Sequence, residues 1–297
     1  MSKTVIFGDS TCDLGKDLRE KYDIQYLPMN YVVDEKEYPA SLDWDAKTAK
    51  EFYDLMRNGK RVRTTQVARD TYETAFTRCL EEGCDVVYIG CSSALSGSVN
   101  QAKLIQKELA PQYSNNRLFC IDALNSSLGQ GHMLIRAAQL RSEGKTATEI
   151  ADYIEANKLK VHQYATVETL EYLRRAGRVK ASKAFFGKLF GVKPIILSDR
   201  IGQNFAFKKA KGTLNARKEV AAQIVAAAVK PEEQTLYISH ADVLEGAEFI
   251  RDEVLKQVQF RDIYINHMAP IVGASVGPGT INVYCVGNEV TILGNDD

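Results

Sequence analysis

Short apolar runs alternate with amphipathic segments along the first half of the chain, and this alternation restricts the fold more than any other feature. Strands are expected over residues 4–9, 24–29, 85–90 and 117–122, and helices over 13–22, 46–59, 71–83, 98–110 and 128–144. This order is typical of parallel βαβ units, whose sheet needs helices on both faces. We therefore predict a doubly wound α/β sheet.

The pattern changes after an expected helix at 146–159. A new strand is expected over 162–170 and a hairpin near 199–207, followed by further α/β segments over 214–229, 234–240, 243–257, 262–268 and 281–287. With 297 residues the chain is long enough for two domains. We predict an N-terminal α/β domain over 1–160 and a second α/β domain over 161–297.

The charge and cysteine content narrow the class of protein. The chain has 38 Lys and Arg residues against 38 Asp and Glu residues, so no overall field attracts nucleic acid. The six cysteines form no C-x-x-C pair, and no run approaches the roughly 18 apolar residues of a membrane span. We predict a cytoplasmic protein. The four histidines lack the spacing of a ligand set, so no metal is predicted.

Small polar residues gather where expected strands end. Ser92, Ser93 and Gly97 follow the strand at 85–90, and Thr64 with Thr65 precedes an expected helix. Each group on its own has the ordinary role of a helix N-cap as an alternative. Because ligands of open α/β sheets bind beyond the carboxyl ends of the strands, the repetition favours a binding site. Hydroxyls without an obligatory Lys or Arg beside them suit a carboxylate better than a triphosphate.

Two other motifs are incomplete. The chain has no G-x-x-x-x-G-K-S/T phosphate loop, and GQGHML lacks the third glycine of a dinucleotide fingerprint, so no nucleotide cofactor is predicted. The stretch GASVG matches the G-x-S-x-G of a hydrolase at Ser275, yet all four histidines precede this serine. A serine-dependent acyl hydrolase or transferase using Ser93 or Ser275 remains the enzyme alternative.

Residues 172–198 combine cations with aromatic residues and contain no acidic residue. One interpretation is a solvated basic face above a buried apolar stripe. The other is a mobile apolar cover that touches an anionic lipid surface or an acidic partner. The residues of this cover would be Phe185, Phe186, Leu189 and Phe190.

Six stretches, in this order, resemble motifs of the DegV family, the fatty-acid-binding subunits of bacterial fatty acid kinase. They read GDSTCDL, RTTQ, SSALSGSVNQA, DALNSSLGQGHMLIRAA, LEYLRRAGRVKASKAFFGKLFGVKPIIL and IVGASVGPG. The family counterparts are D-S-x-x-D-L, T-S-Q, S-S-x-L-S-G-T-x-x-S-A, D-S/T-x-x-x-S-x-G-x-G, L-x-x-L-x-x-G-G-R-I followed by K-P-I, and G-x-H-x-G-P-G. The resemblance covers nearly the whole chain.

The resemblance implies a two-domain fold with a long-chain fatty acid buried between the domains. A separate ATP-binding kinase subunit would phosphorylate the presented carboxylate to an acyl phosphate for phospholipid synthesis, so this chain would be a carrier without a cofactor or catalytic residue. It would be a monomer that touches the membrane transiently. Ser93, together with Thr64 or Thr65, would hydrogen-bond the carboxylate, and Ser92, Gly97, Ser127 and Ser275 would also contact the ligand. Arg178 and Lys211 would face the kinase and the phosphate. The residues that line the tunnel would be Phe185, Phe186, Leu189 and Phe190.

The chain departs from the family pattern at two positions. Ser275 stands where the family has a histidine, which keeps a hydrogen-bond donor but loses the option of a positive charge. Lys211 aligns with a family arginine, which keeps the charge without the bidentate geometry. These departures leave open a lipid sensor that works without a kinase partner.

Overall fold

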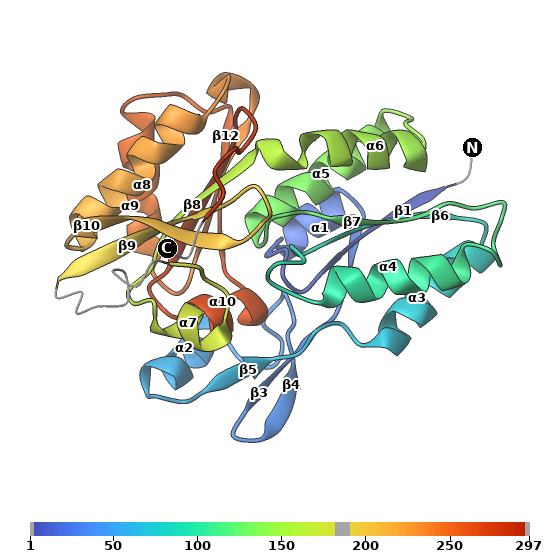
Figure 1. Cartoon of the computed structure of the whole chain (residues 1–297), viewed down its shortest axis with the longest axis horizontal. Coiled ribbons are helices and arrows are strands. Elements are labelled where there is room, and N and C mark those ends of the chain that lie inside the picture. The colour runs from blue at the N-terminus through green and yellow to red at the C-terminus, as the bar shows by residue number, and fades with distance from the viewer. Residues whose placement is uncertain (1–2, 182–190, 295–297) are drawn as a thin grey trace.

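A parallel four-stranded sheet forms the centre of the N-terminal unit (Figure 1), in a computed structural model that describes residues 3–181 and 191–294. The strand order is β2-β1-β6-β7, and all pairs are parallel. Every residue of β1 and β6 is buried, as expected for strands covered on both faces. The strands are β1 (Thr4–Asp9), β2 (Ile24–Leu27), β6 (Asp85–Gly90) and β7 (Leu118–Asp122).

Helices cover both faces of this sheet. Figure 1 shows α3 and α4 on one side and α5 and α6 on the other, while α1 packs against β2. A capping box between Thr146 and Glu149 begins α6, which fixes its N-terminus by two reciprocal hydrogen bonds. The predicted doubly wound sheet is thus confirmed. The helices are α1 (Lys16–Lys21), α3 (Arg69–Glu81), α4 (Ser98–Leu109), α5 (Leu128–Ser142) and α6 (Ala147–Asn157).

A small antiparallel sheet between β2 and α3 was not predicted from the sequence. Its strands β3 (Asn30–Val33), β4 (Lys36–Pro39) and β5 (Val62–Thr64) lie in the order β4-β3-β5, and α2 (Ala49–Arg57) separates β4 from β5. The strands are only three or four residues long. The tight turn between β3 and β4 consists of Asp34 and Glu35, which adopt φ values of 50° and 60°. This turn has no glycine, so the Asn-Gly or Asp-Gly signal of a hairpin is absent from the sequence.

The C-terminal unit is built on a six-stranded sheet in the order β10-β9-β8-β13-β11-β12. The pair β11 and β12 is parallel and the other pairs are antiparallel. The predicted second α/β unit is therefore present, including an antiparallel β9–β10 hairpin. The strands are β8 (Val161–Thr166), β9 (Val192–Ser198), β10 (Asn204–Lys211), β11 (Thr235–His240), β12 (Asp262–His267) and β13 (Ile281–Val286).

The helices of the C-terminal unit divide into two groups. The long helices α8 and α9 pack against each other and against the sheet, whereas the short helices α7 and α10 lie beside α2 and the small sheet (Figure 1). This second group brings the C-terminal unit against β5. The helical segments are α7 (Glu171–Ala176), α8 (Thr213–Ala227), α9 (Leu244–Leu255) and α10 (Pro270–Val276), with short 3-10 turns η1 (Lys158–Lys160) and η3 (Pro231–Glu233).

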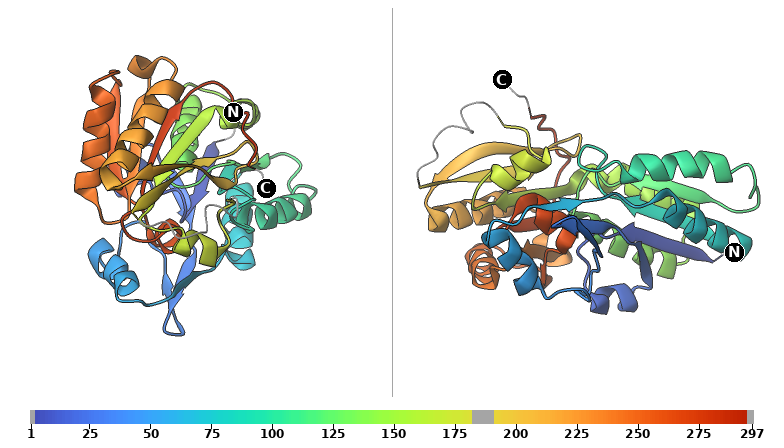
Figure 2. Two further views of the ribbon diagram at one scale, coloured as in Figure 1. Left: turned by 60° about the vertical axis from the view of Figure 1, so that its left-hand side comes forward. Right: turned by 90° about the horizontal axis from the view of Figure 1, so that it is seen from below.

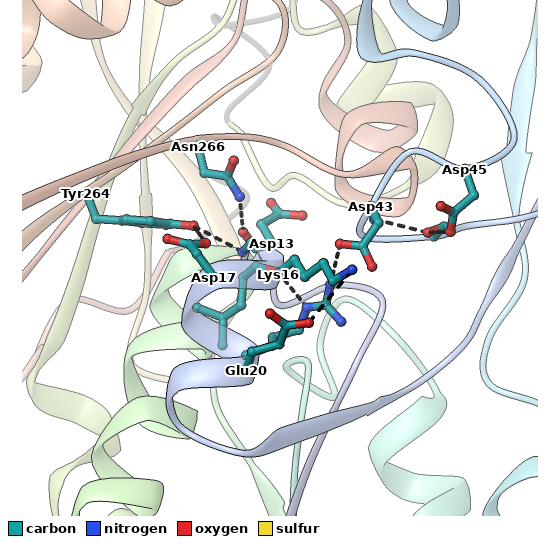
Figure 3. A network of polar contacts seen from close by, with 12 residues as sticks. Asp13, Lys16, Asp17, Glu20, Asp43, Asp45, Tyr264 and Asn266 are labelled. Atoms are coloured by element: carbon teal, nitrogen blue, oxygen red, sulfur yellow. Dashed lines mark hydrogen bonds and ion pairs between the residues drawn. The ribbon is translucent and has the colours of Figure 1, made fainter.

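Polar contacts join the two units, which lie beside each other in both views of Figure 2. The Tyr53 hydroxyl of α2 donates to the Met268 carbonyl oxygen over 2.6 Å. Figure 3 shows Tyr264 and Asn266 of β12 turned toward the start of α1, where the Asn266 amide donates to the Asp13 carbonyl oxygen. The Asp13 carboxyl in turn accepts the backbone N–H of Ala269. These contacts fix the position of the two units relative to each other.

All six cysteines are buried and carry free thiols. No helix in residues 3–181 or 191–294 combines the length and apolar content needed to cross a membrane. The two large sheets are formed by residues before and after Lys160, but the exact division into domains stays a prediction.

Candidate functional site

A cavity of about 210 Å³ with a mixed polar and apolar wall lies between the two units, and we call it the apolar cavity after the apolar side chains on one part of that wall. The N-terminal unit supplies the ends of its strands and the loops that follow them, and the C-terminal unit supplies α7, α10 and the start of β10. The apolar part of the wall consists of Met29, Leu95, Leu173, Ile271, Val272 and Val276. The polar part consists of Thr11, Thr64, Thr65, Gln66, Cys91, Ser96, Gly97, Ser126, Arg178, Asn204 and Ser275.

A second hollow of about 250 Å³ adjoins this cavity, and we call it the basic pocket. Thr64, Arg178 and Ser275 line both hollows, so these three residues form the junction between them. Either volume alone lies below the roughly 300–1,000 Å³ of typical ligand pockets, whereas the two together fall within this range. The cationic residues of the basic pocket are Lys60, Arg61, Arg63, Arg175 and Arg178.

Both predicted threonines line the apolar cavity, but only Thr64 lies at the junction, and the two hydroxyls differ. The Thr65 hydroxyl donates to the Asn30 carbonyl oxygen at 3.2 Å and accepts the Asn30 N–H at 3.1 Å. This hydroxyl therefore ties β5 to β3. Thr64 is half-buried, lines both hollows, and makes no side-chain hydrogen bond within the described residues. Thr64 is thus the hydroxyl that is available to a ligand.

The loop after β6 contributes different residues from those expected. Ser93 is exposed, its backbone N–H donates to the Asp122 carboxylate, and it does not line the cavity. Ser92 is fully buried, and its hydroxyl accepts the Ala94 N–H. Ser93 therefore does not share the cavity wall with the threonine pair, and its contact with a ligand stays a prediction. Ser96 and Gly97 of this loop line the cavity instead, and the predicted contact of Gly97 with a ligand stays a prediction.

In the turn before α5, the residue that lines the cavity is the neighbour of the predicted Ser127. Ser127 sits at φ 56°, fully buried, and its hydroxyl donates to the Asp13 carboxyl and pairs with the Ser239 hydroxyl at 2.8 Å. It thus belongs to the contact between the units and does not line the cavity. The neighbouring Ser126 lines the cavity, and sequence reasoning missed it.

Asp13 is the most unusual acid of this region. Its side chain is buried, and loss of hydration raises its pKa to about 8 although Ser127 and the Ala269 N–H donate to it. The carboxyl is therefore protonated over much of the neutral range. Because it lies behind the cavity wall and not in it, Asp13 has a structural role between the units.

Arg178 is placed at the junction by the end of α7. Gly177 adopts the left-handed conformation at φ 69° and ends the helix, and the Arg178 N–H donates back to the Leu173 carbonyl oxygen. The guanidinium then reaches the N-terminal unit, where its Nε donates to the Leu95 carbonyl oxygen over 2.9 Å. Arg178 is the only cation in the described wall of the apolar cavity.

Asn204 fixes the backbone of the segment that contains Arg178, and the sequence analysis did not predict this residue either. Its amide donates to the Arg178 carbonyl oxygen at 3.1 Å, and its oxygen accepts from Gln163 at 3.0 Å. The Lys180 N–H donates to the Asn204 carbonyl oxygen, which pairs this segment with the start of β10. A lone asparagine at the start of a strand carries no signal for such a role.

Thr11 and Cys91 complete the polar floor of the cavity. Thr11 donates to the Gln130 side chain at 2.6 Å, and its N–H donates to the buried Asp9 carboxylate. Burial raises the pKa of the Cys91 thiol, so this group stays protonated. Asp9 does not line the cavity, and its carboxylate accepts hydrogen bonds from Thr11, Tyr88 and Gln130.

The remaining predicted residues have different positions. Lys211 is exposed at the end of β10, pairs with Val192, and lines neither hollow. Its role toward a phosphate or kinase stays a prediction. The tunnel residues Phe185, Phe186, Leu189 and Phe190 lie outside the described residues, so their role stays a prediction too.

Ser275 lies on α10 at the junction, and its hydroxyl donates to the Ile271 carbonyl oxygen of the preceding helical turn at 3.3 Å. No histidine is found in the described walls of either hollow. A serine nucleophile needs a neighbouring base. Ser275 therefore lacks the imidazole partner that the hydrolase alternative requires.

A third and larger hollow of about 920 Å³ lies elsewhere between the units, against α1, α5 and β12. None of the predicted site residues lines it. Because the predicted Thr64, Arg178 and Ser275 meet at the smaller hollows, we place the candidate site there. Within the described ranges, no group of three or more potential metal ligands occurs.

Three comparisons place the chain among known proteins. A family model described as an uncharacterised protein of the DegV family matches residues 3–287. A DegV domain-containing protein of Clostridium perfringens is 34% identical over 288 residues, covering 97% of this chain and 99% of the relative.

Solved structures of similar proteins have the same fold. The DegV family protein of Thermus thermophilus, described by its fatty acid binding, aligns with a TM-score of 0.86 at 27% identity over 96% of this chain and 99% of its own. A stearic-acid-binding protein of Eubacterium ventriosum aligns with a TM-score of 0.83 at 20% identity over 97% and 98% of the two chains. The extent of the family match and the identity to the clostridial relative show that this chain belongs to the DegV family.

Proposed function

We propose that this chain binds a long-chain fatty acid, with its carboxylate at the junction of the two hollows and its hydrocarbon tail in the apolar cavity. The observation that carries this proposal is the meeting of Thr64, Arg178 and Ser275 at the mouth of an apolar wall. A guanidinium and two hydroxyls are suitable donors for a carboxylate.

The physical chemistry of the tail supports this arrangement. Each CH₂ group that leaves water contributes about 0.8 kcal/mol to binding, so a carrier must enclose the tail while its head group stays accessible. The six apolar residues of the described wall, which come from both units, would contact part of such a tail. The binding named for the Thermus thermophilus and Eubacterium ventriosum proteins agrees with this ligand class.

The chain would act as a carrier that presents the carboxylate to a separate ATP-binding kinase subunit for conversion to an acyl phosphate. Support comes from the open basic pocket beside the junction, which leaves one side of the head group free of protein. The described walls contain no imidazole next to Ser275, so the chain itself would orient the ligand and leave the chemistry to the partner.

Native mass spectrometry of the protein purified from bacteria tests the ligand. We expect a mass increase that matches one fatty acid of fourteen to eighteen carbons, which disappears after delipidation and returns when the acid is added. A protein that takes up no labelled fatty acid after delipidation would contradict the proposal.

Reconstitution with a bacterial fatty acid kinase subunit and ATP tests the carrier role separately. We expect acyl phosphate to form only when this chain, the fatty acid and the kinase subunit are all present. Saturable fatty acid binding without acyl phosphate would instead favour a lipid sensor that works without the kinase. Ester hydrolysis by the chain alone would favour the hydrolase alternative.

A further inference from the structure

The hollow of about 920 Å³ between the units takes no part in the proposed fatty acid site, and we call it the tyrosine cleft. No residue of its described wall lines either of the smaller hollows. The wall comes from α1, α5 and α6 of the N-terminal unit and from β11 and β12 of the C-terminal unit. The volume lies within the roughly 300–1,000 Å³ of typical ligand pockets, so the cleft has room for a small molecule of its own.

Aromatic rings from both units line the tyrosine cleft. The His132 ring of α5 meets the Tyr237 ring of β11 edge to face, with centroids 5.6 Å apart, and Tyr237 meets Tyr264 of β12 over 6.1 Å. Tyr22 and Tyr264 are half-buried and Tyr153 is 38% exposed, so these rings keep surface that a planar ligand can cover. Stacking of a nucleobase on an aromatic side chain contributes about 1–3 kcal/mol.

His132 brings hydrogen-bonding groups to the same wall. The side chain is half-buried, lines the cleft, and makes no hydrogen bond within the described residues. Burial, together with the nearby Arg136 guanidinium, lowers the pKa of His132 to about 4, so the ring is neutral at pH 7. A neutral imidazole has one donor and one acceptor nitrogen. Both nitrogens are therefore open to a ligand, and the edge of a base presents donors and acceptors that match them.

Positive charge exceeds negative charge in the described wall of the cleft, where six cations stand against three acids. Two of the acids, Glu233 and Asp262, pair with cations of the same wall. Lys21 and Lys160 make no ion pair within the described ranges, and the Lys160 ammonium only donates to the Asn157 side chain at 3.0 Å. These two ammonium groups are available to an anion. The six cations are Lys21, Arg136, Lys158, Lys160, Lys230 and Arg261.

We propose that the tyrosine cleft binds a nucleoside monophosphate, with its base against the tyrosine rings and His132 and its phosphate at Lys21 and Lys160. A phosphate monoester carries a charge of about −1.5 to −2, which suits two unpaired ammonium groups better than a single carboxylate does. Such a site needs no glycine-rich phosphate loop, because side chains supply the donors. The inference does not rest on the proposed fatty acid function, since the two sites share no described residue.

Isothermal titration of the whole chain with AMP, GMP, CMP and UMP tests the inference. We expect at least one of the four nucleotides to bind with a Kd below about 1 mM. The matching nucleoside and ribose 5-phosphate should each bind at least about tenfold more weakly, because the first lacks the phosphate and the second lacks the base.

Two variants separate the contacts of the phosphate from those of the base. Lys21→Gln/Lys160→Gln should weaken nucleotide binding about tenfold and change nucleoside binding by less than about twofold. His132→Phe keeps a ring against Tyr237 but removes both nitrogens, so it should weaken nucleotide binding about fivefold and leave ribose 5-phosphate binding unchanged.

The charge-matched control is Lys107→Gln/Lys218→Gln, which removes two exposed cations that line none of the three hollows. It should leave nucleotide affinity unchanged. The inference is overturned if none of the four nucleotides binds at about 5 mM. It is also overturned if nucleotide affinity survives both cleft variants, or if it falls in the control as much as in Lys21→Gln/Lys160→Gln.

Discussion

The guanidinium of Arg178 donates from Nε to the carbonyl oxygen of Leu95 over 2.9 Å, and this contact joins the two units at the mouth of the apolar cavity. Leu95 belongs to the loop after β6, and Arg178 follows the end of α7. One cation is thereby fixed where strand ends, α10 and β5 meet. The position of this charge leads to the first prediction.

Replacing Arg178 by Gln should weaken fatty acid binding about tenfold to a hundredfold, because a hydrogen bond to a charged group contributes roughly 1.5–3 kcal/mol. Binding of the corresponding fatty alcohol should change much less. Isothermal titration with both ligands measures this difference. Arg174→Gln is the matched control, since Arg174 is an exposed cation of α7, the helix that precedes Arg178, and lines neither hollow. Equal losses for acid and alcohol would count against a role of Arg178 in holding the carboxylate.

The two adjacent threonines should respond in opposite ways. Thr64→Val should lower fatty acid affinity about fivefold and leave the free energy of unfolding nearly unchanged, because the Thr64 hydroxyl has no partner within the described residues. Thr65→Val should lower the free energy of unfolding by about 1 kcal/mol, since this hydroxyl bonds to both backbone groups of Asn30. Urea unfolding and ligand titration on each variant measure the two effects. The reverse assignment would show that Thr65, and not Thr64, contacts the ligand.

Asn204 should act on the ligand through Arg178. Asn204→Ala removes the amide that donates to the Arg178 carbonyl oxygen, so the Arg178 segment loses its fixed position. We expect fatty acid affinity to fall about fivefold in the wild-type background and to change little in the Arg178→Gln background. A double-mutant cycle with fatty acid and fatty alcohol measures this coupling. Additive losses with both ligands would indicate that Asn204 only supports the fold.

The buried Asp13 should make stability depend on pH. Burial raises its pKa to about 8 from the usual value of 3.8, so the folded state binds this proton more tightly than the unfolded state. The unfolded state then has fewer bound protons between about pH 4 and pH 8, and the free energy of unfolding falls as the pH rises through this window. Above about pH 8 both states are ionised at this group, and its contribution becomes constant.

Asp13→Asn should remove this slope, because an amide accepts the Ala269 N–H without ionising and tolerates the positive φ of 53° at this position. Thermal unfolding at a series of pH values between 4 and 9 measures the effect. Asp17→Asn is the control, since Asp17 is an exposed acid four residues along the chain. An unchanged slope in Asp13→Asn would place the pH dependence in other groups.

The elements with strong periodicity were predictable from the sequence. The predicted ranges of β1 and β6 agree with the structure, because all six residues of each strand are buried and bounded by polar or small residues. The small sheet was missed because its strands are short and its turn at Asp34 and Glu35 lacks glycine. Propensity carries little information where three residues form a strand by pairing with distant partners.

The site was predictable by segment but not by side chain. The stretch after β6 and the threonine pair both reach the cavity, yet the loop conformation exposes Ser93 and turns Ser96 inward. Likewise the φ of 56° at Ser127 directs its hydroxyl to Asp13 and leaves Ser126 at the cavity wall. Such differences of one to three residues depend on backbone angles that a sequence pattern does not specify. Asn204 and Thr11 are brought to the site only by tertiary contacts.

The most direct test of the central claim is a carbon-13 NMR spectrum of the delipidated chain with palmitic acid labelled at its carboxyl carbon. We predict a single resonance of bound acid that saturates at an equimolar ratio, shifts in Arg178→Gln and in Thr64→Val, and stays in place in Arg174→Gln. A spectrum with only free or micellar acid, or a bound resonance that neither junction variant moves, would contradict a carboxylate held at this junction.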